Sequence, residues 1–305
     1  MKWLAKAATQ KLLSALPASG SLNYLFQRHV TRNLPRSTED FTVHAREAVS
    51  HFRALTGHAP GLDPTRVRAY EFGAGWDLTT PVILAGLGVR HQTLIDIRRN
   101  LRLSEVNHTL RQYADLREAL AERFGCELGA LDTNAVRSDA DLSPRFGIRY
   151  VAPRDARKTG LEADSFEFIS STFTLEHIPA SDLGPILREC SRLLTRDGVI
   201  SCSVDMQDHY SFFDSSLSVY NFLKYSPRSW RWINSSLHFQ NRLRLPDYLR
   251  EFDRSGLDIL EVDPVLPTPV ERAALLEMKL APEFSQGYGT EELEVKSAQI
   301  VARKG

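Results

Sequence analysis

Short apolar runs alternate with amphipathic segments through most of the chain. The apolar runs predict buried β-strands that open at Val67 and continue at residues 92–97, 148–151, 165–170, 199–204, 257–262 and 297–303. Between them, apolar residues at helical spacing predict helices at 79–87, from 98 towards 124, at 183–194, 246–255 and 273–278. Strands that alternate with helices indicate an α/β fold with a mostly parallel sheet and right-handed crossovers.

The first 60 residues have a helical pattern. Leu4, Ala8, Leu12 and Leu16 recur every four residues and predict one face of a helix that ends near Pro17, and a second helix is predicted at 41–55. No acidic residue precedes Glu39, whereas six lysines and arginines do. This pattern fits a helix docked on the main domain with its charges in water, an amphipathic helix on an anionic membrane surface, or a transit peptide.

Composition narrows the class of protein. The 305 residues are 42% hydrophobic and 25% charged, which is ordinary for a globular protein with one main domain. Lys+Arg and Asp+Glu are both 38, so there is no overall field to attract nucleic acid, and no nucleic-acid partner is expected. The three cysteines form no CxxC pair, which favours a reducing, cytoplasmic location, and no apolar run approaches the roughly 20 residues of a membrane span.

The amino-acid composition of the chain changes after residue 205. Residues 205–245 are rich in aromatic and polar side chains and are long for a connection between a strand and a helix, so they predict a lid or a substrate wall. The expected organisation is therefore an N-terminal helical extension (1–60) and one α/β domain (61–305) that carries this insertion.

Acidic residues and glycines at the first two strands point to a nucleotide site. Glu71 ends the opening strand, and Gly73 and Gly75 follow, where missing Cβ atoms let the backbone pass close to a flat ligand. Asp96 ends the second strand, at the spacing from the glycines where an acidic residue accepts hydrogen bonds from ribose hydroxyls. The alternatives are an ordinary strand-to-helix turn for the glycines and a helix N-cap for Asp96.

In this order and spacing, five segments together resemble the class I S-adenosylmethionine-dependent methyltransferases over residues 65–305. They are Glu71-Phe72-Gly73-Ala74-Gly75, Asp96, Asp155-Ala156, Leu175-Glu176-His177-Ile178 and Leu193-Leu194-Thr195-Arg196-Asp197-Gly198. The resemblance implies a Rossmann-like seven-stranded sheet with an antiparallel last strand. It also implies S-adenosyl-L-methionine as cofactor: Gly73 and Gly75 under its methionine and ribose, Glu71 near its amino group, Asp96 on the ribose, and Asp155 with Ala156 at the adenine.

The chain departs from the family pattern in the glycine loop. The common third glycine is Asp77, and Trp76 precedes it, so Trp76 is expected to pack against the ligand or under the N-terminal helices. The Glu-x-Gly-x-Gly-Trp form, the helical N-terminus and the acidic cluster after residue 205 are similar to bacterial methyltransferases found with polysaccharide or natural-product genes. That narrower resemblance suggests a sugar or glycolipid acceptor.

Histidines supply candidates for a general base. A sulfonium already makes its methyl group electrophilic, so the protein has to align the acceptor and take a proton from a hydroxyl. His177 follows the fourth strand, with a packing role as the alternative, and His209 is the rival, oriented by Asp205 or Asp208. Asp205, Asp208, His209 and Asp214 could also hold a divalent ion, but convergence of these ligands is not expected, and no metal is predicted.

The insertion also carries candidate substrate contacts. Arginines there could grip a phosphate or carboxylate of the acceptor, and aromatic rings could stack on a sugar or build a core. The candidate substrate residues are Asp208, Tyr225, Asn241 and Arg242.

The sequence thus predicts an S-adenosylmethionine-dependent methyltransferase that acts on oxygen of a small-molecule, sugar or lipid-linked glycan acceptor. Two alternatives stay open. A nicotinamide-dependent oxidoreductase would also need the glycines and the acidic ribose ligand, although it would not explain Leu175-Glu176-His177-Ile178. A non-catalytic scaffold of the same fold would bind a partner through the N-terminal helices.

Overall fold

The structure, a computed structural model, describes residues 2–14, 24, 28 and 34–305. The predicted end of the first helix, at Leu16 and Pro17, lies outside the described residues. None of the helices in the described part of the chain has both the length and the hydropathy that a membrane span requires.

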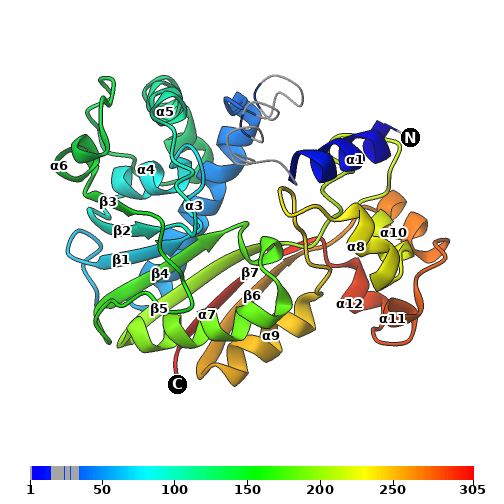
Figure 1. Cartoon of the computed structure of the whole chain (residues 1–305). Coiled ribbons are helices and arrows are strands. Elements are labelled where there is room, and N and C mark those ends of the chain that lie inside the picture. Colours follow the sequence, from blue (N-terminus) through cyan, green and yellow to red (C-terminus); the bar gives the residue numbers. More distant parts are fainter. Residues whose placement is uncertain (1, 15–23, 25–27, 29–33) are drawn as a thin grey trace.

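A seven-stranded sheet forms the centre of the molecule, as the sequence predicts (Figure 1). Its order is β3-β2-β1-β4-β5-β7-β6, and β7 runs antiparallel to both of its neighbours. The strands are β1 (Arg68–Phe72), β2 (His91–Ile95), β3 (Ile148–Val151), β4 (Phe166–Thr172), β5 (Leu194–Asp205), β6 (Leu257–Val265) and β7 (Ser297–Lys304). The first five strands are parallel, so their carboxyl ends share one edge of the sheet.

Helices cover both faces of this sheet (Figure 1). One face is covered by α3 (Thr38–His58), α4 (Thr79–Gly86) and α5 (Leu103–Phe124), and the other by α7 (Ala180–Leu193) and α9 (Leu245–Arg254). A short 3-10 helix, η2 (Asp139–Asp141), and α6 (Leu142–Phe146) lead into β3. Each face has its own core of buried aliphatic and aromatic side chains, which is the two-layer burial that a parallel sheet needs.

Element boundaries differ from the prediction where local hydrogen bonds extend an element. Helix α3 begins three residues before the predicted start, because the Ser37 side chain accepts a hydrogen bond from the Asp40 backbone at 3.1 Å and caps the helix. Strand β5 begins five residues early. Phe166 pairs with Leu194 and Phe168 with Val199, so the predicted turn at 197–198 is an irregularity inside the strand.

Helix α1 (Lys2–Ser14) presents its predicted apolar face to solvent. Trp3 and Ala7 are buried together with Lys6 and Gln10, whereas Leu4 and Leu12 are 43% and 73% exposed. A helix docked through Leu4, Ala8 and Leu12 was the expectation, and the structure corrects it. Trp3 supplies the larger apolar surface, and it anchors the helix on Tyr210, with 5.4 Å between ring centroids.

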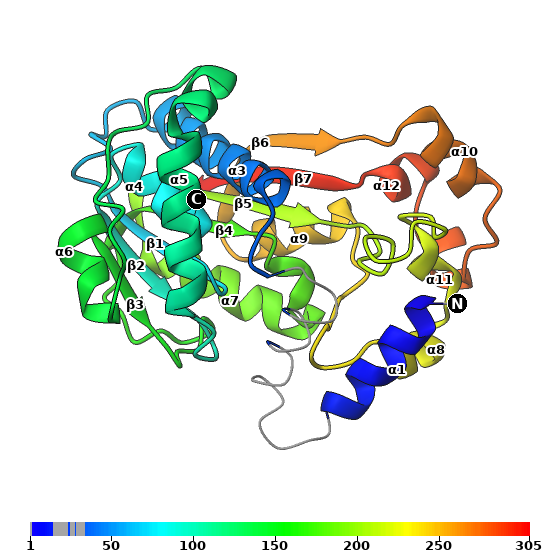
Figure 2. The same cartoon turned by 90° about the horizontal axis from the view of Figure 1, so that it is seen from above.

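Three separate parts of the chain build a third core beside the sheet (Figure 2). They are α1, residues 210–230 of the insertion, and residues 275–293 between β6 and β7. The helices here are η4 (Asn221–Lys224), α8 (Pro227–Ile233), α10 (Pro269–Leu276), α11 (Pro282–Ser285) and α12 (Thr290–Glu294). Most aromatic side chains of the insertion are core, which follows from their ability to bury large apolar area.

A buried cation ties this third core to the sheet. Arg244 is fully buried and donates to the carbonyls of Met206 (2.6 Å), Leu293 (2.7 Å) and Val295. The Met206 carbonyl lies at the start of the insertion, whereas those of Leu293 and Val295 lie at the end of the segment between β6 and β7. One guanidinium therefore joins these two segments.

Candidate functional site

A cavity of about 780 Å³ opens at the carboxyl ends of the parallel strands. In α/β sheets of this kind, that edge is where ligands bind. Of the predicted site residues, it is lined by Glu71, Gly73, Gly75, Asp96, Asp155, Ala156, His177 and His209. The three carboxylates and the glycine pair therefore border one cleft, and the histidines border the same cleft.

Glu71 lies at the end of β1 and is only 4% exposed. Its hydrogen-bond partner among the described residues is the Ser170 hydroxyl, at 3.4 Å. Burial raises the pKa of Glu71 to about 8. A buried carboxyl with so little compensation favours a cationic ligand, which would restore its ionised form.

The glycine pair leaves space for a ligand on the cavity side. Gly73 and Gly75 both have positive φ, at 79° and 73°. A Cβ on Gly73 would lie 2.4 Å from the side chain of Thr174, whereas a Cβ on Gly75 would meet no protein atom within 4 Å. Since Gly75 also lines the cavity, its missing side chain leaves room for a ligand rather than for the protein's own packing.

Asp96 follows β2 and is 6% exposed. It accepts hydrogen bonds from the Arg98 backbone at 3.2 Å and from Asn100 Nδ2 at 3.1 Å. Burial raises its pKa above the ordinary value. These contacts orient the carboxylate at the cavity wall, where ribose hydroxyls could donate to its remaining acceptor positions.

Asp155 lies at a more open rim of the cavity, beside Ala156. Its side chain is 40% exposed and pairs with Arg157, whose Nη2 lies 2.7 Å away. Arg157 also bonds Asp182 at 3.0 Å. Hydrogen bonds from Arg157 hold the pKa of Asp155 below its ordinary value. A ligand that bonds Asp155 must therefore share this carboxylate with Arg157 and with water.

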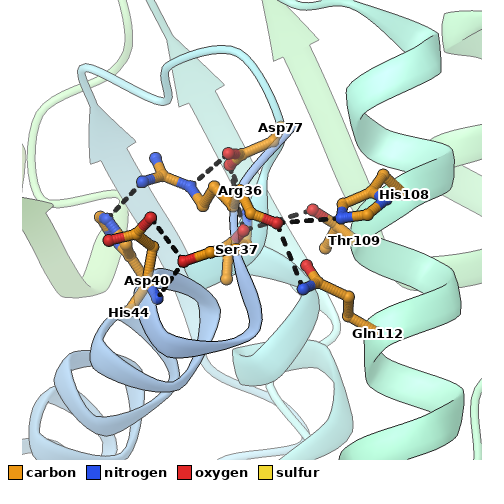
Figure 3. Close-up of polar contacts among 9 residues, drawn as sticks. Arg36, Ser37, Asp40, His44, Asp77, His108, Thr109 and Gln112 are labelled. Carbon is orange, nitrogen blue, oxygen red and sulfur yellow. Dashed lines mark hydrogen bonds and ion pairs between the residues drawn. The ribbon is translucent and has the colours of Figure 1, made fainter. Parts of the chain in front are cut away.

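Asp77, at the position of the third glycine, anchors the N-terminal segment (Figure 3). Its Oδ2 pairs with Arg36 Nε, and its Oδ1 accepts from the backbone and hydroxyl of Thr79, each at 3.1 Å. Arg36 Nη1 lies 2.6 Å from His44 Nε2, and the Arg36 carbonyl accepts from His108 at 3.0 Å. In place of a third glycine the loop has Asp77, whose carboxylate binds Arg36. Arg36 and His44 therefore lie at the loop and line the cavity.

Trp76 stacks on an N-terminal residue, Tyr24, with 5.3 Å between ring centroids and 25° between planes. The guanidinium of Arg102 lies 5.4 Å from the Trp76 ring and 5.3 Å from the Tyr24 ring. Trp76 also lines the cavity, so its contact with a ligand stays a prediction.

Three imidazoles meet at the lid end of the cavity. His177 and His209 have ring centroids 5.0 Å apart, and His238 lies 6.4 and 5.8 Å from them. His177 Nδ1 donates to the Phe239 carbonyl at 2.7 Å, which leaves Nε2 with a free lone pair. Burial lowers the pKa of His177 to about 4 and that of His238 well below its ordinary value, so both rings are neutral.

Asp205 lies behind His209 and does not line the cavity. Its Oδ2 is 3.2 Å from His209 Nε2, an ion-pair distance without the alignment of a hydrogen bond. Gln207 donates its backbone N–H to Asp205 Oδ1 at 2.9 Å and fixes the carboxylate. Asp205 favours the proton on Nε2 of His209, which leaves Nδ1 as the ring nitrogen able to accept a proton.

A carboxylate and two imidazoles could hold a metal ion here. Ligand atoms of Glu176, His177 and His209 all lie within 4.8 Å of one another. Glu176 is 1% exposed, and neither of its oxygens has a hydrogen-bond partner among the described residues. Burial, followed by the charge of Asp205, raises the pKa of Glu176 well above its ordinary value. Asp208 and Asp214 are outside this group, so the acidic cluster predicted after residue 205 does not converge.

The structure revises the four predicted substrate residues, since none lines the cavity. Asp208 is fully buried and accepts from Asn221 Nδ2 at 3.0 Å. Tyr225 packs against Trp230 and belongs to the third core. Arg242 donates to the Phe222 carbonyl at 3.0 Å and pairs with Glu283 at 2.6 Å. It therefore joins the insertion to the segment between β6 and β7.

Asn241 is a positioning residue for the Leu175–His177 turn, the 3-10 helix η3. Its Nδ2 donates to the carbonyls of Leu175 and Ile178, both at 2.9 Å, and its backbone N–H donates to the backbone carbonyl of Glu176 at 2.7 Å. Its sequence position, just before α9, gave no indication of these partners. Asn241 thus fixes the segment that carries His177 without touching the cleft.

Arg36, His44 and His238 line the cavity but were not anticipated as site residues. Arg36 and His44 precede the glycine loop, in a segment interpreted as a helical extension. No pattern in the sequence indicates that such a segment folds back over the loop. His238 lies among polar residues of the insertion, and its distance from His177 becomes evident only in three dimensions.

Comparison with known proteins agrees with this geometry. The family model described as "Methyltransferase domain" matches residues 109–202, which include β3, β4, η3 and α7. No curated protein sequence matches the chain significantly. The match to the family model starts after the glycine loop. The roles of Glu71, Gly75 and Asp96 are therefore argued from the cavity that they line.

Solved structures with similar folds include several methyltransferases. An S-adenosylmethionine-dependent methyltransferase from Mesorhizobium loti is 18% identical, with 84% of this chain and 98% of that chain covered and a TM-score of 0.43. Geranyl diphosphate C-methyltransferase from Streptomyces coelicolor A3(2) is 11% identical, with 85% and 81% covered and a TM-score of 0.45. The cyclase SpnF is 15% identical, with 85% and 81% covered and a TM-score of 0.47. These similarities are too low to say anything about the reaction of this chain.

The strand order with its antiparallel β7 is the Rossmann-like arrangement that the sequence resemblance implies, and residues 109–202 match the methyltransferase domain family. S-adenosylmethionine is the cofactor expected for such a domain.

The pKa of Glu71 leads to a prediction for cofactor binding. Below about pH 8 the free protein holds a proton on Glu71, and an ammonium group beside it would lower that pKa. Binding of S-adenosylhomocysteine is therefore expected to release up to one proton near neutral pH, and its affinity should rise as the pH approaches 8. Calorimetry in buffers with different ionisation enthalpies measures this release. Glu71→Gln should abolish it, and an unchanged release in that variant would exclude Glu71 as its source.

Two glycines form a matched pair for testing the loop. Gly75 and Gly125 both have positive φ, and a Cβ on either would meet no protein atom within 4 Å, but only Gly75 lines the main cavity. Alanine at either position should cost about 1–2 kcal/mol of stability through backbone strain. Only Gly75→Ala should also weaken S-adenosylhomocysteine binding, by about tenfold or more, because its methyl group would enter the ligand's space. Melting temperatures and calorimetric affinities of both variants separate the two effects; equal affinities would contradict this assignment.

Proposed function

We propose that this enzyme transfers the methyl group of S-adenosylmethionine to a hydroxyl oxygen of a small-molecule, sugar or lipid-linked glycan acceptor. The observation that supports this most directly is the continuity of one cavity from Glu71, Gly75 and Asp96 to the three imidazoles. A cofactor on the first group would direct its methyl towards the second. An acceptor between them would meet the methyl group and a proton acceptor together.

In this proposal the acceptor oxygen forms a bond to the methyl carbon as the carbon–sulfur bond breaks. S-adenosylhomocysteine leaves, and the hydroxyl proton passes to His209. We assign the base to His209 rather than to His177, because the low pKa of His177, about 4, makes that ring a weak base. His177 then packs edge-on against His209 and keeps it in place. Asp205 is a positioning residue that favours the reactive tautomer of His209.

Cofactor contacts follow from the same geometry. Glu71 would hold the amino group, Asp96 the ribose hydroxyls, and Asp155 with Ala156 the adenine, while Gly73 and Gly75 let the backbone approach the ligand. Arg36, at the cavity wall beside the loop, places a guanidinium where a carboxylate of the cofactor could be neutralised.

Mass-resolved screening with an isotopically labelled methyl donor tests the reaction. The full-length protein would be incubated with fractionated glycan, lipid and metabolite extracts, and labelled products would be identified by mass. The proposal expects a product that carries the label on oxygen. A label on nitrogen or carbon would overturn the acceptor assignment, and binding of S-adenosylhomocysteine without any labelled product would support a scaffold instead.

A further inference from the structure

Helix α1 carries an outward apolar ridge that none of the described residues covers. Trp3, Lys6, Ala7 and Gln10 point into the third core, while the exposed Leu4 and Leu12 lie with Ala8 on the opposite face. An amphipathic helix normally buries such a ridge. Here the strongest anchor, Trp3, has fixed the helix with the ridge towards solvent.

Helix α8 lies beside α1 and extends this surface (Figures 1 and 2). Lys11 Nζ donates to the Arg231 carbonyl at 3.3 Å, which joins the two helices. Trp230 is buried in the third core, but Trp232 is 74% exposed. We call the surface formed by Leu4, Leu12 and Trp232 the α1–α8 surface.

The charged residues of α1 and α8 are all lysines and arginines. The chain as a whole is neutral, yet residues 1–38 contain six lysines and arginines and no acidic residue, and residues 215–246 contain five and no acidic residue. Lys11, Arg228 and Arg231 from these segments are exposed on α1 and α8. The remainder of the chain therefore carries an excess of eleven acidic residues.

We infer that the α1–α8 surface docks on an anionic membrane. Exposed leucines and a tryptophan flanked by lysine and arginine have the composition of helices that lie in the headgroup region, with apolar side chains in the acyl boundary and cations on lipid phosphates. Tryptophan favours this interface because its ring is apolar and its N–H is polar. A protein partner would need a complementary acidic surface, and an anionic bilayer supplies that charge without specific shape.

The position of the cavity connects this surface to the enzyme. The loop that follows α8 supplies Ser236, Leu237, His238 and Phe239 to the cavity wall. Docking through α8 would therefore bring the histidine end of the cavity close to the lipid headgroups. This consequence for the acceptor rests on the proposed function. It narrows the acceptor to an amphiphile whose polar head enters the cavity while its chain stays in the bilayer.

Vesicle flotation of the full-length protein tests the inference. We expect binding to phosphatidylcholine vesicles that contain phosphatidylglycerol, little binding to phosphatidylcholine alone, and weaker binding as salt is raised. Leu12→Asp combined with Trp232→Ser should reduce vesicle binding by roughly tenfold or more, and so should Arg228→Gln combined with Arg231→Gln. The matched control is Val270→Asp, since Val270 is 79% exposed on α10, away from the basic segments, and should bind as the unchanged protein does.

The outcomes separate this inference from the proposed function. Calorimetry with S-adenosylhomocysteine, run on every variant, shows whether the fold and cofactor site are intact. If the unchanged protein does not bind anionic vesicles, or if Val270→Asp binds as weakly as the α1–α8 variants, the inference is overturned while methyl transfer stands. If sedimentation velocity shows that Leu12→Asp dissociates a dimer and vesicles are not bound, the α1–α8 surface is a contact between copies of the chain.

Discussion

A His209→Ala variant is expected to lose about 10²- to 10⁴-fold in methyl transfer, the range for removal of a positioned general base, while its affinity for S-adenosylhomocysteine stays unchanged. The reason is the separation of the two groups along one cavity. His209 borders the end of the cavity that we propose for the acceptor, and the carboxylates that we propose for the cofactor border the other end. The measurement is single-turnover transfer to the acceptor found in the labelled screen, with calorimetry in parallel.

Two comparisons make the His209 result specific. Asp205→Asn should give a smaller loss in turnover and a changed pH profile, because the ring would stay but lose the carboxylate that favours its tautomer. His238→Ala removes a neighbouring imidazole that the proposal does not use as base, and it should retain most of the turnover. Full activity in His209→Ala would exclude His209 as the base. If a chelator abolished transfer and a divalent ion restored it, Glu176, His177 and His209 would instead be metal ligands.

The second large effect is expected at the cofactor. Asp96→Ala should weaken S-adenosylhomocysteine binding by about 10- to 100-fold, since hydrogen bonds to a charged group contribute about 1.5–3 kcal/mol. Asp96 is 6% exposed, so little water competes for its acceptor positions. Asp155→Ala is the natural comparison. Its carboxylate is 40% exposed and already shared with Arg157, and the loss of affinity should be only a few-fold.

Calorimetry on both aspartate variants decides this ranking. Because Asp96 also bonds the Arg98 backbone and Asn100, the melting temperature of Asp96→Ala must be measured as a control for loss of the local loop structure. Asp96→Asn keeps one acceptor oxygen and should lie between Asp96→Ala and the unchanged protein. Equal affinities for Asp96→Ala and Asp155→Ala would contradict the assignment of Asp96 to the ribose.

The sheet was predictable because each strand obeys a local rule. β1, β2 and β4 are short apolar runs between turn residues, and a strand buried on both faces requires such a run. Glu71 and Asp96 could be placed at the same edge for a related reason, since parallel strands bring their carboxyl ends together. That Glu71, Gly75 and Asp96 border one cavity therefore followed from the order of residues along the chain.

The lid end was less predictable because its contacts join distant segments. Asn241 and Arg242 looked like substrate contacts, as polar residues in an insertion often are. Their partners are carbonyls of residues 175 and 178 and of Phe222, which no sequence spacing indicates. Likewise, the period of Leu4, Ala8 and Leu12 marks an apolar face but does not show which face the larger Trp3 side chain will bury.

The third core has a consequence for how acceptor preference could change. The insertion packs together with α1 and with the segment between β6 and β7. Arg244 and Arg242 form hydrogen bonds and an ion pair that join the insertion to the latter segment. Such a block has little freedom to swing as a hinged flap, so selection among acceptors would depend on fixed shape. Substitutions at Leu237 or Phe239, on the loop that faces the cleft, could then retune that shape while the scaffold behind it stayed intact.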